Sequence, residues 1–241
     1  QLEPFLINHF TKQGIIYSHI IRLRGIGESA VAEKLDDIIT SQTNPTIAIY
    51  ARRGEIIIRI TAKCMEVNEA KTLIAAMEAL VNTRLKQYIY GTDDETLASY
   101  LGKELLRTES TIAFAESCTG GLASSLVTDV PGSSEYLLGS AVTYSNMAKH
   151  KLINVSEESL EAYGAVSWQV ACEMAQGVRE LFGTTYGVGI TGIAGPTGGT
   201  KEKPVGLVYL GCASRNGVTV ERYVFSGSRQ EVRMSAVHAA L

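Results

Sequence analysis

From about residue 92 to residue 241, short apolar runs typical of strands alternate with segments of helical periodicity. Strands are expected at 111–115, 139–144, 186–191, 205–213 and 218–225, and helices at 120–128, 146–152, 156–163, 167–182 and from 228 onward. Such alternation predicts a partly parallel, mixed sheet with helices on both faces, a three-layer α/β/α arrangement. In open α/β sheets the ligand binds at the carboxyl ends of the strands, so chemistry is expected there.

The residues before this region follow the order strand-helix-strand-strand-helix and predict a smaller α+β unit. Strands are expected at 15–23, 46–50 and 55–62, and helices at 28–41 and 67–85. Arg52-Arg53-Gly54 predicts a hairpin turn. Thr92 and Glu95 have the spacing of a capping box and are expected to begin the next helix. The two domains are therefore assigned to residues 1–90 and 91–241.

Composition limits the classes of function. The chain has 241 residues, 45% hydrophobic and 20% charged, and a net charge of −3, which favours neither nucleic acid nor an anionic membrane as partner. Its four cysteines (Cys64, Cys118, Cys172, Cys212) are too widely spaced for a disulfide framework or a zinc cluster, so we expect reduced thiols in a cytoplasm. The sequence has no apolar run of about 18 residues that could span a membrane. A start at Gln1 and an end within a helical pattern indicate a piece of a longer protein.

The first strand end that carries polar residues is Glu116-Ser117-Cys118-Thr119-Gly120-Gly121. Ser117 stands ahead of the free N–H groups of a helix N-terminus, which is what an oxyanion hole requires. A structural strand-to-helix turn explains the same residues and is the commoner case. Cys118 is an alternative nucleophile, because a thiol at a helix N-terminus can have a lowered pKa.

Two further strand ends are candidates. Tyr144 and Lys149 can face one cleft, and a lysine can act as a base where burial lowers its pKa, although a solvated surface lysine is more common. His150 beside it is read as a surface residue. The glycine-rich segment 189–201 suggests backbone close to a phosphate, or else a flexible hairpin-like loop. It is not a Walker loop, because Thr200 separates Gly199 from Lys201.

Four segments together resemble the C-terminal domain of the CinA family, a nicotinamide mononucleotide deamidase also called PncC. They are AESCTGG (115–121), VTYSNMAKHKLINV (142–155), GITGIAGPTGGT (189–200) and FSGSRQEVR (225–233). Residues 1–90 resemble the middle, KH-like domain of CinA. A counterpart of that family's N-terminal domain, which is associated with ADP-ribose pyrophosphatase activity, is not apparent in this chain. The resemblance implies hydrolysis of nicotinamide mononucleotide to nicotinate mononucleotide and ammonia, without metal or other cofactor, in a homodimer.

The resemblance also implies roles for individual residues. Ser117 is expected to be the nucleophile, Lys149 the base and Tyr144 an assisting residue. The residues expected to contact the substrate are Glu116, Cys118, Thr119, Gly120, Gly121, Thr191, Gly192, Gly195 and Arg229. The phosphate of the nucleotide substrate is expected to bind to the backbone N–H groups of 195–199 and to the guanidinium of Arg229, because these groups donate hydrogen bonds to anions.

Two alternatives to an active hydrolase remain. The first is a binding module for nucleotides or nucleic acid, related to competence and using the KH-like segment. Against it, Gly25-Ile26-Gly27 does not match the Gly-x-x-Gly clamp of KH domains, and residues 1–91 carry 11 Lys and Arg against 9 Asp and Glu. Nucleic acid is therefore not expected as a partner, and this segment is expected to be a spacer or a dimerisation element. The second alternative is a catalytic fold that has lost its activity.

Overall fold

The computed structural model describes residues 14–52 and 54–241, and its internal contacts divide the chain into two compact units, Gln1–Glu95 and Thr96–Leu241. The described elements of the first unit are β1 (Ile15–Leu23), α2 (Glu28–Lys34), α3 (Asp36–Ser41), β2 (Thr46–Arg52), β3 (Glu55–Cys64), α4 (Val67–Leu85), η2 (Lys86–Tyr88) and β4 (Ile89–Thr92). The expected strands and the long helix 67–85 are confirmed. The expected single helix over 28–41 is wrong, because the helix is interrupted at Leu35.

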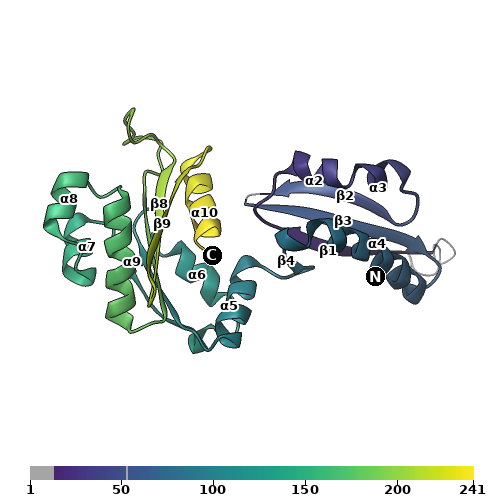
Figure 1. The fold of residues 1–241 in the computed structure, drawn as a ribbon, viewed down its shortest axis with the longest axis horizontal. Coiled ribbons are helices and arrows are strands. Elements are labelled where there is room, and N and C mark those ends of the chain that lie inside the picture. Colours follow the sequence, from purple (N-terminus) through teal and green to yellow (C-terminus); the bar gives the residue numbers. More distant parts are fainter. Residues whose placement is uncertain (1–13, 53) are drawn as a thin grey trace, which may run out of the picture. The chain divides into compact units, whose positions relative to one another are not determined.

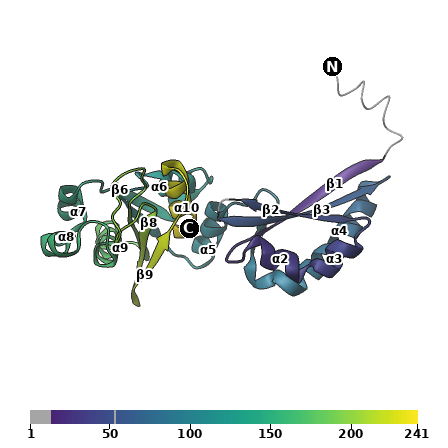
Figure 2. The same cartoon turned by 90° about the horizontal axis from the view of Figure 1, so that it is seen from above.

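The first unit is an antiparallel sheet of order β2-β3-β1-β4 with its helices on one face (Figure 2). One apolar core lies between sheet and helices, where Leu23, Val31, Ile58 and Val81 are all fully buried. β2 and β3 pair as far as Arg52 and Glu55, as expected for a hairpin, although Arg53 of its turn lies outside the described residues. The small α+β domain predicted from the sequence is therefore present.

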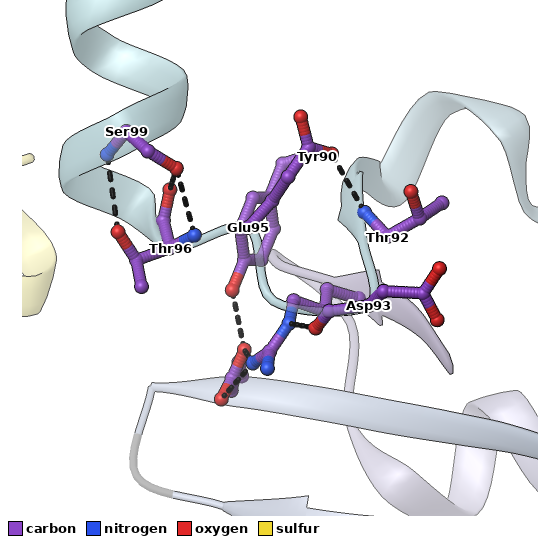
Figure 3. Close-up of polar contacts among 8 residues, drawn as sticks. Tyr90, Thr92, Asp93, Glu95, Thr96 and Ser99 are labelled. Atoms are coloured by element: carbon purple, nitrogen blue, oxygen red, sulfur yellow. Dashed lines mark hydrogen bonds and ion pairs between the residues drawn. The ribbon is translucent and has the colours of Figure 1, made fainter. Parts of the chain in front are cut away.

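The capping box expected at Thr92 and Glu95 is wrong. Thr92 ends β4, which pairs with β1, and its N–H donates to the Glu95 carboxylate at 2.8 Å (Figure 3). The helix begins four residues later with a different box, in which Thr96 and Ser99 exchange backbone-to-side-chain hydrogen bonds of 3.1 and 2.9 Å. Thr92 cannot cap the helix because its backbone already belongs to the sheet. β4 was missed because four residues are too few to show a strand pattern.

The second unit contains a five-stranded mixed sheet of order β6-β5-β7-β8-β9. Its strands are β5 (Ile112–Glu116), β6 (Leu137–Val142), β7 (Tyr186–Gly192), β8 (Leu207–Ser214) and β9 (Gly217–Val224). Its helices are α5 (Leu97–Arg107), α6 (Leu122–Thr128), α7 (Asn146–Ile153), α8 (Glu157–Tyr163), α9 (Trp168–Phe182) and α10 (Arg229–Ala240), with a 3₁₀ turn, η3 (Ser133–Glu135). β5 is parallel to its neighbours β6 and β7, whereas β8 is antiparallel to its neighbours β7 and β9.

Helices cover both faces of this sheet, as the alternation predicts. α9, with α7 and α8 packed against it, lies on one face, and α5, α6 and α10 lie on the other (Figure 1). Alternation along β5 sends Phe114 into the core beneath α10 and Ala115 into the core beneath α9. Full burial of a side chain like Phe114 contributes about 1.5–3 kcal/mol. The α9 face is lined by small residues, and a Cβ added at Gly189 would lie 2.7 Å from the Ala171 oxygen, so the helix lies directly against the backbone of the strands.

The arrangement of the three parallel strands fixes where a site can form. β5, β6 and β7 end at Glu116, Val142 and Gly192, and parallel neighbours present their carboxyl ends at one edge of the sheet. The loops that follow these strands therefore meet there. Within the described residues, no helix is both long and apolar enough to cross a bilayer.

Candidate active site

Ser117 and Lys149 are in contact at the carboxyl edge of the sheet. Ser117 is the residue directly after β5, and Lys149 lies in the first turns of α7, whose N-cap Ser145 accepts a hydrogen bond from Ala148 N–H. Lys149 Nζ lies 3.0 Å from Ser117 Oγ. Both side chains are buried, with exposed fractions of 1% for Lys149 and 8% for Ser117. The structure thus joins two residues that are 32 positions apart in the sequence.

The surroundings of Lys149 lower its pKa and so increase the share of neutral amine. Its Nζ donates to the carbonyl oxygens of Thr143, at 2.9 Å, and Tyr144, at 3.4 Å. Burial lowers the pKa of Lys149 from 10.5 to about 8, and the nearby Cys118 sulfur opposes this shift in part. A neutral amine has two N–H groups and one lone pair. The two carbonyls can take the N–H groups, which leaves the lone pair for the hydroxyl proton of Ser117.

Glu116 binds the start of α6 through its carboxylate. It is fully buried, and its two carboxylate oxygens accept from the N–H groups of Gly121, Ala123 and Ser124 at 2.9–3.1 Å and from Ser124 Oγ at 2.9 Å. A carboxylate is stabilised at a helix N-terminus by the free N–H groups and the helix dipole. These four bonds use the acceptor capacity of Glu116. They also occupy the helix N–H groups that the sequence suggested for an oxyanion.

Cys118 is poorly suited to be the nucleophile. Its side chain is 6% exposed, and burial raises the pKa of its thiol to about 11, with the charges of Lys149 and Arg233 acting against the rise. A thiol with that pKa is protonated at neutral pH and therefore a weak nucleophile. The other candidate nucleophile is Ser117, and its hydroxyl is hydrogen bonded to Nζ of Lys149, the residue expected to be the base. The geometry therefore favours Ser117 over Cys118.

Two glycines and a threonine shape the turn that carries Ser117. Gly120 and Gly121 have φ values of +60° and +94°, in the left-handed region that residues with a side chain rarely adopt. Gly120 N–H donates to the Ser117 carbonyl at 3.2 Å. Thr119 is fully buried, and its hydroxyl has no hydrogen-bond partner within the described residues. These residues set the path of the loop, as a close turn between β5 and α6 requires.

Arg233 is a part of the site that sequence reasoning missed. Its Nε donates to the Cys118 carbonyl oxygen at 3.1 Å and its Nη2 to that of Thr119 at 2.6 Å. A signal was present in the sequence, because Arg233 follows Arg229 by four residues and so lies on the same face of α10. The segment FSGSRQEVR (225–233) contains both arginines, but the resemblance implies a role for Arg229 alone.

Arg229 is bound to Tyr144 and to the glycine-rich loop. Its Nη1 donates to the Gly195 carbonyl at 2.8 Å and its Nη2 to the Tyr144 hydroxyl at 3.1 Å. Tyr144 is 62% exposed. Its hydroxyl is thus bound to Arg229, while its backbone oxygen is the part that contacts Lys149. These residues join the second and third strand ends into one surface beside the Ser117–Lys149 pair.

Thr191 and Gly192 hold the end of β7 in place. Thr191 is fully buried, and its hydroxyl donates to the Ala165 carbonyl oxygen at 2.7 Å, which ties β7 to the segment before α9. A Cβ at Gly192 would lie 2.7 Å from the Leu207 oxygen, so this strand end accepts only glycine without a shift of β8. The described part of the chain has no group of three or more His, Cys, Asp or Glu side chains arranged to hold a metal ion.

Comparison with known proteins identifies the family of the chain. The family model described as CinA C-terminal domain matches residues 94–241, and the model described as Damage-inducible protein CinA KH domain matches residues 18–91. The chain belongs to the CinA family. A putative competence-damage inducible protein of Moorella thermoacetica is 47% identical over 100% of this chain and 60% of its own length. A protein of the same description from Clostridium acetobutylicum is 49% identical over 99% of this chain and 57% of its own. The chain therefore spans about three fifths of these CinA relatives.

Solved CinA-family structures resemble about three fifths of the chain. The competence/damage inducible protein CihA from Agrobacterium tumefaciens is 40% identical with a TM-score of 0.59, covering 60% of this chain and 88% of that one. A CinA superfamily protein from Escherichia coli is 34% identical with a TM-score of 0.58, covering 60% and 84%.

Proposed function

We propose that this chain is an amidohydrolase that converts nicotinamide mononucleotide to nicotinate mononucleotide and ammonia, with Ser117 as nucleophile and Lys149 as base. The observation that carries the proposal is the buried contact of 3.0 Å between Ser117 Oγ and a lysine whose pKa burial lowers to about 8. A serine attacks an amide only when a base takes its proton, and a lysine can be that base only when it is neutral. The choice of substrate rests on the resemblance to the deamidase domain of the CinA family.

The reaction follows from these two residues. Ser117 Oγ attacks the carboxamide carbon while its proton moves to Lys149 Nζ, which gives a tetrahedral intermediate with a negatively charged oxygen. The carbon–nitrogen bond then breaks, and the proton held by Lys149 passes to the departing nitrogen, so that ammonia leaves. Water attacks the resulting ester of Ser117 with Lys149 again as base. The nicotinate carboxylate is released and the serine hydroxyl is restored.

Arg229 is proposed to bind the phosphate of the nucleotide. It stands at the first residue of α10, and the bonds to Gly195 and Tyr144 hold its guanidinium in one orientation. A guanidinium has five N–H donors, so two of its bonds leave others for an anion. This places Tyr144 as a residue that orients Arg229, in addition to the contact of its backbone with Lys149.

The direct test is release of ammonia from nicotinamide mononucleotide by the wild-type chain and three variants, Ser117→Ala, Lys149→Met and Cys118→Ala. Loss of Ser117 or Lys149 is expected to reduce kcat by at least about 10³-fold, because nucleophile and base act as one unit. Cys118→Ala is expected to keep most of the activity. An active Ser117→Ala variant together with an inactive Cys118→Ala variant would transfer the nucleophile to the thiol. A wild-type chain that releases no ammonia would refute the substrate and favour a binding protein or an inactive fold.

The assembly is proposed to be a homodimer, as the resemblance implies, in a reducing cytoplasm that suits the four free thiols. Light scattering after size-exclusion chromatography distinguishes the dimer, at twice the 26.0 kDa of one chain, from a monomer.

A further inference from the structure

Arg233 binds the loop that carries Ser117 through two bonds from one guanidinium. Its Nε and Nη2 donate to the carbonyl oxygens of Cys118 and Thr119, the two residues directly after Ser117, at 3.1 and 2.6 Å. Because the guanidinium is planar and rigid, two such bonds fix the orientation of both peptide groups. A lysine could supply the charge at this position without that geometry.

The helix that carries Arg233 is itself firmly held. Ser228 and Glu231 form a capping box at the start of α10. On either side of Arg233 along the helix, Val232 and Ala236 are fully buried in the core beneath the sheet. The guanidinium therefore extends from a well-packed helix to the loop after Ser117, and movement of that loop would break the two hydrogen bonds.

Two amides close to Ser117, those of Cys118 and Thr119, have no acceptor in another residue within the described part of the chain. Ser117 N–H donates to the Ile190 carbonyl at 2.9 Å, and Gly120 N–H donates to the Ser117 carbonyl at 3.2 Å. The N–H groups at the start of α6 bind the Glu116 carboxylate. For Cys118 N–H, the described residues provide no backbone or side-chain acceptor beyond its own thiol. The amide that follows a nucleophile is well placed to stabilise the oxyanion of a tetrahedral intermediate.

The positive charge of Arg233 favours negative charge in the loop after Ser117. The positive charges of Lys149 and Arg233 both lower the pKa of the Cys118 thiol, against the larger effect of burial, so a negative charge in this loop is favoured by both. Lys149 must be neutral when it takes the proton of Ser117. The guanidinium of Arg233 is then the remaining cation of the pair.

We propose that Arg233 is a positioning residue for the reaction at Ser117. By binding the carbonyls of Cys118 and Thr119 it holds the loop with the Cys118 N–H directed at the developing oxyanion. Its charge favours the negative tetrahedral intermediate. The inference rests on the proposed role of Ser117 as nucleophile, and it assigns to Arg233 an effect on the chemical step rather than on substrate binding.

The test compares Arg233→Met, Arg233→Lys and the control Arg179→Met in the full chain. Arg179 also donates to a carbonyl oxygen, that of Thr185 at 3.1 Å, but it lies in the last turn of α9 at the other end of the sheet. Three quantities are measured for each: kcat and KM for ammonia release, the rate at which p-nitrophenyl acetate acylates Ser117, read by mass spectrometry, and the melting temperature.

Arg233→Met is expected to lower kcat roughly 100-fold, the size of effect seen when an oxyanion donor is lost, while KM changes less than about threefold. Acylation of Ser117 should slow in parallel. Arg233→Lys should recover part of the rate, because an ammonium can donate to the same carbonyls without the planar fork. Arg179→Met should change the melting temperature but not kcat, KM or the rate of acylation.

The inference is overturned if Arg233→Met lowers kcat no more than Arg179→Met does, if it changes only KM, or if its loss of activity matches the unfolded fraction. The acylation measurement separates this inference from the proposed substrate. A wild-type chain that acylates Ser117 but releases no ammonia refutes the substrate alone, and slower acylation in Arg233→Met still supports the positioning role. A wild-type chain that does neither overturns both.

Discussion

The burial of Lys149 makes a quantitative prediction about stability that does not depend on the substrate. Its pKa is lowered on folding, from 10.5 to about 8, so between these pH values the unfolded chain binds more protons than the folded chain. The free energy of unfolding therefore rises with pH across that window. At about 1.4 kcal/mol per pKa unit, the full shift corresponds to about 3 kcal/mol of destabilisation at pH values well below 8.

Replacing Lys149 with Met removes this titration, because Met has no proton to lose. The difference in unfolding free energy between wild type and Lys149→Met should shift in favour of wild type by roughly 2–3 kcal/mol between pH 7 and pH 10. The variant also lacks the hydrogen bonds of the lysine, which adds a constant offset to this difference. The slope with pH comes from the buried amine. No discount for solvent screening applies to a side chain that is 1% exposed.

The assay is urea unfolding at pH 7, 8, 9 and 10, followed by the fluorescence of Trp168. This is the single tryptophan of the chain and the first residue of α9, so it reports on the second unit. Lys151→Met is the matched control, because Lys151 is an exposed lysine of the same helix and should show no comparable slope. If the difference for Lys149→Met stays within about 0.5 kcal/mol over this pH range, the buried neutral amine is refuted.

Three further predictions follow from individual contacts. The value of kcat/KM for ammonia release should rise about tenfold per pH unit up to about pH 8 and then level off, since only neutral Lys149 accepts the serine proton; a flat profile would contradict this role. Glu116→Gln should lower the free energy of unfolding by roughly 1–3 kcal/mol in calorimetry, because its NH₂ group would face N–H donors of α6. Gly177→Ala should cost about 3 kcal/mol in urea unfolding, because the new Cβ would lie 1.8 Å from the Ile153 oxygen; an unchanged midpoint would count against this packing.

Elements with a long, regular pattern were predictable from the sequence. The helix Val67–Leu85 and the strand Ile15–Leu23 lie where periodicity places them. The errors occur where a local signal has competing partners. Thr92 and Glu95 have capping-box spacing, yet Thr92 is paired with Ile21 in the first sheet, and Thr96 caps the helix instead. Sequence spacing alone cannot show which partner a backbone group takes.

Polar residues at the ends of the parallel strands, Ser117, Tyr144 and Lys149 among them, were predictable through the rule that such groups meet at one edge of the sheet. Their partners were not. The sequence suggested that Glu116 and the amides of α6 serve a ligand, whereas the structure pairs them with each other. Arg233 ends the segment FSGSRQEVR (225–233), but its partners are backbone oxygens more than 100 positions away, which sequence spacing does not reveal.

The sequence by itself determined the two-unit organisation, the mixed sheet with helices on both faces, and the chemical groups at each strand end. These follow from local periodicity and residue type, which the order of residues specifies directly. Only the tertiary structure decided that Lys149 is buried against Ser117, that Cys118 has a raised pKa, and that Tyr144 is bound to Arg229. Burial, pKa and hydrogen-bond partner depend on which distant segments pack together, so they arise only once the chain has folded.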